Sequence, residues 1–193
     1  LQAGSPTSAK VIFETFRRAT HMSLEEVFAM ELGLAIQFCR HPDFREGVRA
    51  ACSPFDDEYW LARDDDGKFP REFHRAMAEG GWLGIAMPEE VGGSGLGLME
   101  ASIMMQTVAR SGAGFTGCSS IHLNIFGAKP IEKFGTSEQK QEFLPKIIAG
   151  EQKMCFGVTE PNSGLDTSSL QTRAEDRGDP FLVNGQKVWT TYG

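Results

Sequence analysis

The sequence predicts a mostly α-helical chain that ends in the first strands of a β-domain. Through most of residues 1–150, apolar residues recur at three- and four-residue steps, and glycine and proline separate the segments. Near Lys153 the pattern changes to the period of two that is typical of strands. Asn184-Gly185 is a strong signal for a two-residue hairpin turn, so residues 186–191 are predicted to form the strand that follows it.

Length and composition narrow the class of protein. The chain has 193 residues, which allows one or two domains, and 40% of them are apolar, as in ordinary globular proteins. The net charge of −7 argues against binding nucleic acid through a basic surface. No apolar run approaches the roughly 20 residues of a membrane helix, and no leader precedes the first helix. We therefore expect a cytoplasmic protein without a membrane span.

Cysteine usage and the chain ends lead to two more expectations. The cysteines show no metal-ligand spacing and are typical of scattered thiols in a reduced compartment; they are Cys39, Cys52, Cys118 and Cys155. The chain begins with Leu1 and ends directly after a predicted strand. An unpaired strand exposes backbone donors and acceptors, so we expect both ends to be cut from a longer protein.

Residues 1–50 are predicted to be helical. Ser5-Pro6 suits a helix start, and an apolar stripe follows at Val11, Ile12, Thr15, Phe16 and Ala19. Ser23 and Glu26 form a capping box ahead of an inner face made by Val27, Met30, Leu34 and Phe38. His41-Pro42 ends that helix, and residues 43–50 are predicted to form one more short helix.

Residues 51–69 are predicted to be a junction. Ser53-Pro54 is expected to begin a helix, with Asp56 and Asp57 favourable near its positive end. The run 64–67 (Asp-Asp-Asp-Gly) predicts a solvated turn. The alternative is that the three aspartates form a metal-binding loop. The run lacks the alternating ligands and terminal Glu of a calcium loop, so no metal site is predicted.

Residues 70–97 are predicted to form an amphipathic helix and a glycine-rich loop. The helix spans 70–80 with Phe73 and Met77 inward, and Gly80-Gly81 stops it before Trp82-Leu83. The loop spans 87–97. As a phosphate cradle it would need a preceding strand and a nucleotide-binding glycine pattern, and it has neither.

Residues 98–150 predict further helices. The first runs from Leu98 to Arg110 with Leu98, Ala101, Met105 and Val108 on one face, and residues 111–114 break it. Residues 119–126 are predicted to be helical, with His122 packed in the core, and the methionines Met99, Met104 and Met105 are interpreted as core residues. Pro130 opens the next helix and Gly135 ends it. Thr136 and Gln139 form a capping box, Pro145 restarts the helix and Gly150 ends it.

A polar turn follows the predicted strand 155–159. Pro161 fixes a backbone angle, and Gly164 can adopt a positive φ. Hydroxyl, amide and carboxylate groups come from Thr159, Asn162, Ser163 and Asp166. Such a turn is suited to a polar, anionic ligand. Beyond it, residues 170–174 and 180–183 are predicted strands joined by a turn at 177–179.

The order of these residues resembles the acyl-CoA dehydrogenase flavoprotein family. The matching runs are 157–161 (Gly-Val-Thr-Glu-Pro), 163–166 (Ser-Gly-x-Asp) and 184–191 (Asn-Gly-Gln-Lys-x-Trp-x-Thr), and the loop at 88–95 is also similar. The resemblance covers about residues 54–193. It implies a helical N-terminal domain over 51–152 and an incomplete flavin-binding β-domain over 153–193.

The resemblance also implies a reaction. Members hold FAD and remove two hydrogens across the α,β-carbons of an acyl-CoA thioester; a carboxylate takes the α-proton, and the flavin accepts hydride. Implied partners are the acyl-CoA substrate, an electron-transfer flavoprotein or similar acceptor, and further copies in a homo-oligomer. The family's catalytic carboxylate lies in a C-terminal helical domain that this sequence lacks. We therefore expect no catalytic residue here, no activity of this chain alone and no tight retention of FAD.

Site residues follow from the resemblance position by position. The flavin contacts implied are Phe156, Val158, Thr159, Gly164, Trp189, Thr190 and Thr191. Among them, Gly164 would let the backbone approach the cofactor and Trp189 would pack against the ring system, with core packing as its alternative. Leu165 stands where the family usually has a Ser that touches phosphate or acyl-CoA, and a leucine offers no hydrogen bond there.

Residues 1–50 are similar to a different family. Their runs 5–10, 23–26 and 41–50 resemble the C-terminal helices of the enoyl-CoA hydratase/isomerase superfamily, nearest the 3-hydroxyisobutyryl-CoA hydrolase-like branch. His21, His41 and Glu46 could be called catalytic, but a surface or helix-end role is favoured. Three hypotheses stay open: a dehydrogenase fragment joined to a hydratase tail, which is favoured; a hydratase or thioester hydrolase fragment; and a non-catalytic interaction module or chimeric product.

Overall fold

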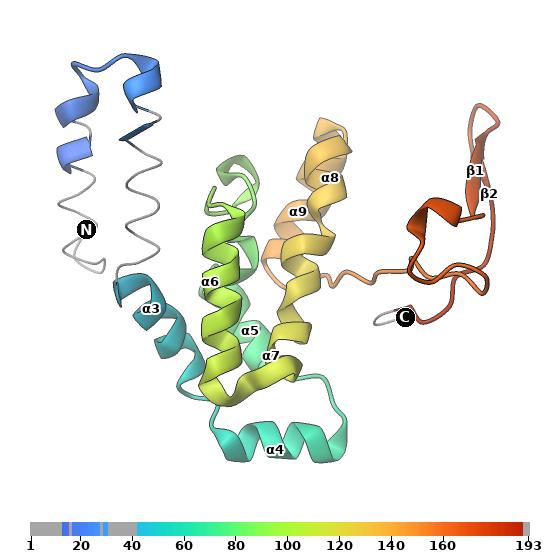
Figure 1. Ribbon diagram of the computed structural model, residues 1–193, viewed down its shortest axis with the longest axis horizontal. Helices are drawn as coiled ribbons and strands as arrows, with labels where there is room; N and C mark the ends of the chain where they lie inside the picture. Colours follow the sequence, from blue (N-terminus) through green and yellow to red (C-terminus); the bar gives the residue numbers. More distant parts are fainter. Residues whose placement is uncertain (1–12, 16, 28, 31–41, 191–193) are drawn as a thin grey trace. The chain divides into compact units, whose positions relative to one another are not determined.

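The computed structural model describes residues 13–15, 17–27, 29–30 and 42–190 (Figure 1). The chain divides into two compact units, one comprising residues 1–68 and 97–118 and the other residues 69–96 and 119–193. The structure is mostly helical with one small sheet near its C-terminus, which confirms the predicted fold class. The predicted domain boundaries after residues 50 and 152 stay predictions. Within the described residues, no helix is both long and apolar enough to cross a membrane.

The first unit begins with helical residues at 13–15, 17–19, 24–27 and 29–30. The predicted capping box is confirmed, because the Ser23 N–H donates to Glu26 Oε2 at 2.8 Å and the Glu26 N–H donates to Ser23 Oγ at 3.3 Å. The other predictions here rest partly on residues 1–12, 16, 28 and 31–41. Those positions, His41 among them, lie outside the described residues.

Helix α3 (Pro42–Cys52) confirms the predicted short helix, and it packs against α6 (Leu98–Val108). Helix α4 (Asp57–Asp66) begins later than Ser53-Pro54 because Asp56 is its N-cap and accepts a hydrogen bond from the Tyr59 N–H at 3.0 Å. The run of three Asp therefore closes the last turn of this helix. Gly67, at φ +62°, caps its end.

Trp60 anchors the core of the first unit. Its indole N–H donates to the Phe55 carbonyl at 3.1 Å, which satisfies the polar atom of a buried ring. Gly117 lies so close to this indole that a Cβ there would approach it to 3.2 Å. The remaining buried apolar side chains of this unit are Val48, Cys52, Phe55, Ala101, Met104, Val108 and Ala113.

Helix α6 buries a face shifted from the predicted one. Ala101 and Val108 are fully buried as expected, but Met104 takes the inner position, Met105 is half-buried and Leu98 is exposed. Of the three methionines, only Met104 is therefore a core residue. The predicted break is a π-helix, η3 (Ala109–Ala113), with Gly112 at φ +98°, and α7 (Gly114–His122) follows earlier than predicted.

The second unit begins with α5 (Arg71–Glu79), whose buried face includes Phe73 and Met77 as predicted. Two short 3-10 helices follow, η1 (Trp82–Gly84) and η2 (Glu89–Val91). The glycine-rich loop folds back on itself, and the Gly95 N–H donates to the Met87 carbonyl at 2.8 Å. A Cβ on Gly93 would lie 2.2 Å from that carbonyl oxygen, so glycine is required there by close backbone approach.

A pair of helices that lie side by side in Figure 1 completes the second unit's helical core: α8 (Lys129–Phe134) and α9 (Ser137–Ile148). Pro130 lies in the first turn of α8 and Gly135 ends it, as predicted; the Thr136–Gln139 capping box before α9 is also confirmed. Pro145 does not restart a helix, because α9 continues through it. The π-helix η4 (Leu123–Gly127) follows α7, and its His122 neighbour is half-buried.

The sheet consists of β1 (Arg173–Asp176) and β2 (Phe181–Asn184), paired antiparallel with Arg173 opposite Asn184. The turn predicted at 177–179 joins them. The hairpin predicted at Asn184-Gly185 is wrong, since Asn184 is the last paired residue of β2 and residues 185–190 form no strand. Residues 155–159 also form no continuous strand. The 3-10 helix η5 (Thr167–Ser169) precedes the sheet.

Candidate functional site

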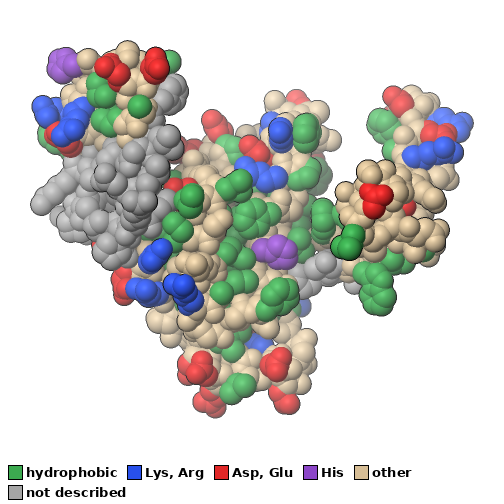
Figure 2. All heavy atoms as spheres, in the orientation of Figure 1, with side chains coloured by type: hydrophobic (Ala, Val, Ile, Leu, Met, Phe, Trp, Pro, Cys, Tyr) green, Lys and Arg blue, Asp and Glu red, His purple; other side chains and the backbone are tan. Residues whose placement is uncertain are grey.

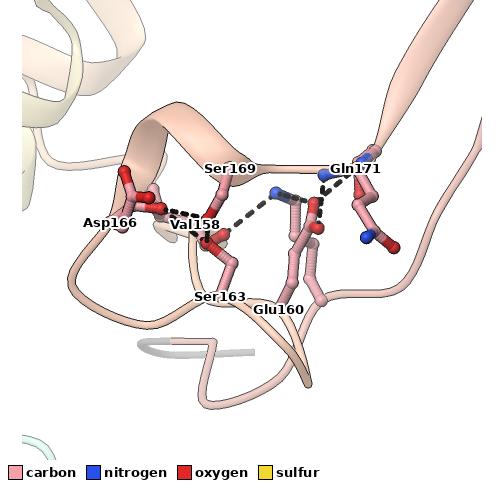
Figure 3. Close-up of polar contacts among 8 residues, drawn as sticks. Val158, Glu160, Ser163, Asp166, Ser169 and Gln171 are labelled. Atoms are coloured by element: carbon pink, nitrogen blue, oxygen red, sulfur yellow. Dashed lines mark hydrogen bonds and ion pairs between the residues drawn. The ribbon is translucent and has the colours of Figure 1, made fainter.

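The polar turn at 160–172 is closed by its own side chains (Figure 3). Glu160 and Ser163 exchange two backbone hydrogen bonds of 2.9 and 3.1 Å. Ser163 Oγ donates to the Asp166 carbonyl at 2.6 Å, and it lies 3.0 Å from Ser169 Oγ. The Asp166 carboxylate accepts from the Ser168 backbone at 3.0 Å and from its hydroxyl, and these bonds lower the pKa of Asp166. Ser163 and Asp166 therefore shape the turn.

Glu160 is the centre of this network. Its carboxylate accepts from the backbone N–H groups of Gln171 at 2.7 Å and Thr172 at 2.9 Å, and from Lys187 Nζ at 2.9 Å. Hydrogen bonds from Thr172, Gln171 and Lys187 lower the pKa of this buried carboxyl to about 2. Glu160 is therefore ionised near neutral pH and serves as an anchor rather than as a proton acceptor.

Lys187 connects the turn to the segment that follows the sheet. Its Nζ donates to the Val158 carbonyl at 2.9 Å as well as to Glu160, and the Val188 N–H donates to the Thr159 carbonyl at 2.9 Å. A Cβ on Gly157 would lie 3.4 Å from Thr190 Oγ1. Residues 157–160 and 187–190 are therefore neighbours, although they form no regular ladder.

Three of the predicted site residues take part in these contacts; they are Val158, Thr159 and Thr190. Phe156 and Trp189 are their near neighbours in sequence. Val158 and Thr159 are half-buried, whereas Phe156 and Trp189 expose 55% and 88% of their surface. Core packing of Trp189, the alternative, is thus wrong in this structure. Trp189 also has a φ of +56°, which is rare for a residue with a bulky side chain.

The remaining predicted residues are placed differently. Gly164 is exposed, its φ is not positive, and a Cβ there would meet nothing within 4 Å, so the structure does not itself require a glycine at this position. Leu165 is fully exposed beside it. Thr191 lies outside the described residues.

The arrangement suits a planar aromatic ligand. Phe156 and Trp189 are exposed residues of the two neighbouring segments that carry half-buried Val158 and Thr159, and exposed aromatic rings can stack on flat π-systems while nearby hydroxyls offer hydrogen bonds. A strained backbone angle at Trp189 is the kind of feature that concentrates at binding sites. Within the described residues, no group of three or more His, Cys, Asp or Glu side chains could hold a metal ion.

Glu160 and Lys187 were missed as structural residues by the sequence reasoning. Both belong to the runs that carry the family resemblance, but a charged residue in a polar turn is usually solvated. The local sequence contains no signal for this pair, because Lys187 follows the polar Gln186 and its carboxylate partner lies 27 positions earlier.

The candidate residues of the hydratase-like segment are not assembled into a site. His21 is exposed on a turn. Glu46 is exposed on α3, where it forms a 3.4 Å surface ion pair with Arg49. His41 lies outside the described residues.

Comparison with known families gives two matches. The family described as "Acyl-CoA dehydrogenase, N-terminal domain" matches residues 40–151, and the family described as "Enoyl-CoA hydratase/isomerase" matches residues 1–57. Both resemblances noted from the sequence are therefore confirmed, with the first covering more than half of the chain.

Individual relatives agree with the longer match. The chain is 40% identical over 128 residues to a protein named probable acyl-CoA dehydrogenase YngJ of Bacillus subtilis (strain 168), covering 66% of this chain and 33% of that protein. It is 37% identical over 131 residues to the caffeyl-CoA reductase-Etf complex subunit CarC of Acetobacterium woodii, covering 66% and 34%.

Solved structures show the same likeness. The acyl-CoA dehydrogenase from Geobacillus kaustophilus superimposes with a TM-score of 0.67 and 29% identity, over 80% of this chain and 40% of that one. The chain spans about a third of the length of the curated relatives named above.

Proposed function

Because the chain belongs to the acyl-CoA dehydrogenase family, we propose that it contributes the N-terminal helical domain and one wall of the flavin site to an FAD-dependent acyl-CoA dehydrogenase. The single observation that carries the proposal is the contact between residues 157–160 and 187–190. That contact puts exposed Phe156 and Trp189 on neighbouring segments with half-buried Val158 and Thr159.

These residues fit a flavin. Phe156 and Trp189 offer apolar ring surface, and the Thr159 and Thr190 hydroxyls offer hydrogen bonds toward polar ring atoms. The Glu160–Lys187 ion pair, whose side chains are mostly buried, holds the two segments together. When bound, FAD supplies the electron acceptor for α,β-dehydrogenation of an acyl-CoA thioester. The described residues orient the cofactor, and we assign none of them to proton transfer.

The proposal extends to partners and compartment. The relative from Acetobacterium woodii is named as a subunit of a complex with Etf, which supports an electron-transferring flavoprotein as the acceptor. Acyl-CoA as substrate and a homo-oligomeric parent protein follow from family membership. A reducing, cytoplasmic environment is supported by three free thiols among the described residues, Cys52, Cys118 and Cys155.

The hydratase alternative is less favoured. Its family match ends at residue 57, and neither His21 nor Glu46 lies in a built site.

Flavin titration tests the proposal. The purified chain should bind FAD weakly, with quenching of flavin fluorescence and without retention through gel filtration. Trp189→Ala should weaken binding about tenfold, whereas Phe181→Ala, which removes another exposed aromatic ring, from β2, should change it less than twofold. Equal loss in both variants, or no quenching by the wild-type chain at any FAD concentration, would contradict the assignment. Stoichiometric FAD in the purified chain would contradict weak retention.

A further inference from the structure

A pocket beside α3 and α6 is lined by cationic and uncharged polar side chains. Its volume is about 170 Å³, and its lining residues are Arg45, Arg49, Gln106, Thr107, Arg110 and Ser111. Three of these six residues are arginines and none is acidic. Figure 2 shows Lys and Arg side chains gathered over α3. The pocket lies within the first unit and shares no residue with the flavin-facing segments.

The fold brings these arginines together against their mutual repulsion. Arg45 and Arg49 are four residues apart and therefore lie on one face of α3, where like charges disfavour the helix. Arg110 comes from the π-helix that follows α6, so a second element adds another positive charge to the same pocket. The convergence of like charges on one concave surface calls for a compensating anion.

The arginines are poorly compensated by the protein. Within the described part of the chain, Arg45 Nε is buried and has no hydrogen-bond partner, and neither Arg45 nor Arg110 forms an ion pair. Arg49 has only the exposed 3.4 Å contact with Glu46. A buried N–H without an acceptor is unfavourable, so the protein itself does not complete the hydrogen bonding of the Arg45 guanidinium group.

The free hydrogen-bond donors of the pocket come mainly from its arginines. The Thr107 hydroxyl already donates to the Ile103 carbonyl at 2.7 Å, and the Ser111 hydroxyl donates to the Val108 carbonyl at 2.8 Å. The remaining donors are the guanidinium groups and the Gln106 amide. Guanidinium forks match the oxygens of phosphate and carboxylate groups. We propose that this arginine pocket binds the phosphate group of a small molecule.

Phosphate is favoured over a single carboxylate for two reasons. Three guanidinium groups surround the pocket, and a phosphate carries nearly two negative charges at neutral pH. Its oxygens also point in several directions, which matches donors that come from two different elements. The source is either a free inorganic anion or a phosphomonoester, and both present the same chemistry.

Calorimetric titration at constant ionic strength tests the proposal. Inorganic phosphate, pyrophosphate and glycerol 3-phosphate are titrated into the purified chain, with chloride keeping the ionic strength fixed. We expect saturable 1:1 binding of at least one of these probes. Tighter binding of glycerol 3-phosphate identifies a phosphomonoester site, and tighter binding of the inorganic probes identifies a free-anion site; either order supports the pocket. No saturable binding of any probe overturns the proposal.

Matched variants test the location. Arg45→Gln and Arg110→Gln should each weaken binding at least tenfold, whereas Arg75→Gln, which removes the same charge from an exposed position on α5, should change it less than twofold. An equal loss of phosphate affinity in all three variants overturns the assignment of binding to this pocket, because the loss would then follow from the change in overall charge. Should Arg45→Gln fail to fold, Arg45→Lys is the substitute variant. It keeps the positive charge but removes the planar guanidinium group that can donate two parallel hydrogen bonds. Wild-type affinity for phosphate in the Arg45→Lys variant would overturn the claim that the Arg45 guanidinium group recognises phosphate through paired hydrogen bonds.

Discussion

Glu160 and Lys187 form a 2.9 Å ion pair in which the carboxylate side chain is 5% exposed and the ammonium side chain 28% exposed. The same ammonium group donates to the Val158 carbonyl. One lysine therefore joins the polar turn to the segment that carries Trp189. Loss of this contact should separate the two segments that we assign to the flavin wall.

Removal of the lysine charge should raise the pKa of its partner. In Lys187→Met, Glu160 keeps its bonds from Gln171 and Thr172 but loses the cation, so its pKa should rise from about 2 toward the ordinary value of 4.5. Carboxyl-carbon NMR titration measures this change. Lys146→Met, at an exposed position on α9, is the charge-matched control and should leave it unaltered. An unchanged pKa in Lys187→Met would show that the ion pair contributes nothing.

Acid should loosen the turn before it unfolds the helices. Because the pKa of folded Glu160 is lowered from 4.5 to about 2, its contribution to stability is complete above pH 4.5 and is lost progressively as the pH falls toward 2. Amide signals of residues 157–160 and 187–190 should therefore shift in that window. Glu160→Gln should remove this transition. Persistence of the same transition in that variant would assign it to another group.

Asn124 should be essential for the end of α9. Its buried Nδ2 donates to the Ile147 and Gln152 carbonyls, both at 3.0 Å. Asn124→Leu leaves these two acceptors without that donor, and we expect a loss of about 2–4 kcal/mol in the free energy of unfolding. Urea denaturation measures it. Asn162→Leu, at an exposed position, should stay within about 0.5 kcal/mol of the wild type, and a similar loss in both variants would contradict the argument.

His74 should make the second unit sensitive to mild acid. Burial lowers the pKa of this imidazole below 6.5, with the positive charge of Lys153 acting in the same direction. The folded state therefore resists protonation, so stability should fall as the pH drops below 6.5. Urea midpoints at pH 7.5 and 5.5 test this. His74→Gln should reduce the difference, whereas the exposed His21→Gln should not; identical pH dependence in all three proteins would rule out His74.

Two glycines should differ in their tolerance of one added methyl group. Gly93→Ala would place a Cβ 2.2 Å from the Met87 carbonyl oxygen, and we expect a loss of about 2–3 kcal/mol in the free energy of unfolding. Gly164→Ala meets nothing within 4 Å and should stay within about 0.5 kcal/mol. Thermal denaturation compares them. If Gly164 admits a cofactor, its alanine variant should still weaken FAD binding; unchanged binding would contradict that role.

Much of the helical framework was predictable because its signals are local. Capping boxes at Ser23–Glu26 and Thr136–Gln139 depend on residues three apart, and both are present. Glycine stops after α5 and α8 were likewise correct. The prediction that Pro145 restarts a helix was wrong, because α9 continues through this residue. A proline in a helix interior is unfavourable, but its neighbours Leu144 and Ile147 are buried in the core here.

The strands were predicted less well because strand pairing is not local. Asn184-Gly185 has the composition of a hairpin turn, but the turn at 177–180 joins β1 and β2, and Asn184 pairs with Arg173. Residues 186–190 instead lie beside residues 157–160, about thirty positions earlier, through Lys187 and Val188. Neither distant partner is encoded in the local pattern.

By itself, the sequence determined the helical class, the end of the helical part near Gly150 and the family to which the chain belongs, because each depends on short-range spacing or on ordered motifs. Only the tertiary structure decided which residues meet. It buried Glu160 against Lys187, exposed Trp189 and gathered Arg45, Arg49 and Arg110 around one pocket. These outcomes depend on contacts between segments far apart along the chain, and periodicity within one segment carries no information about such contacts.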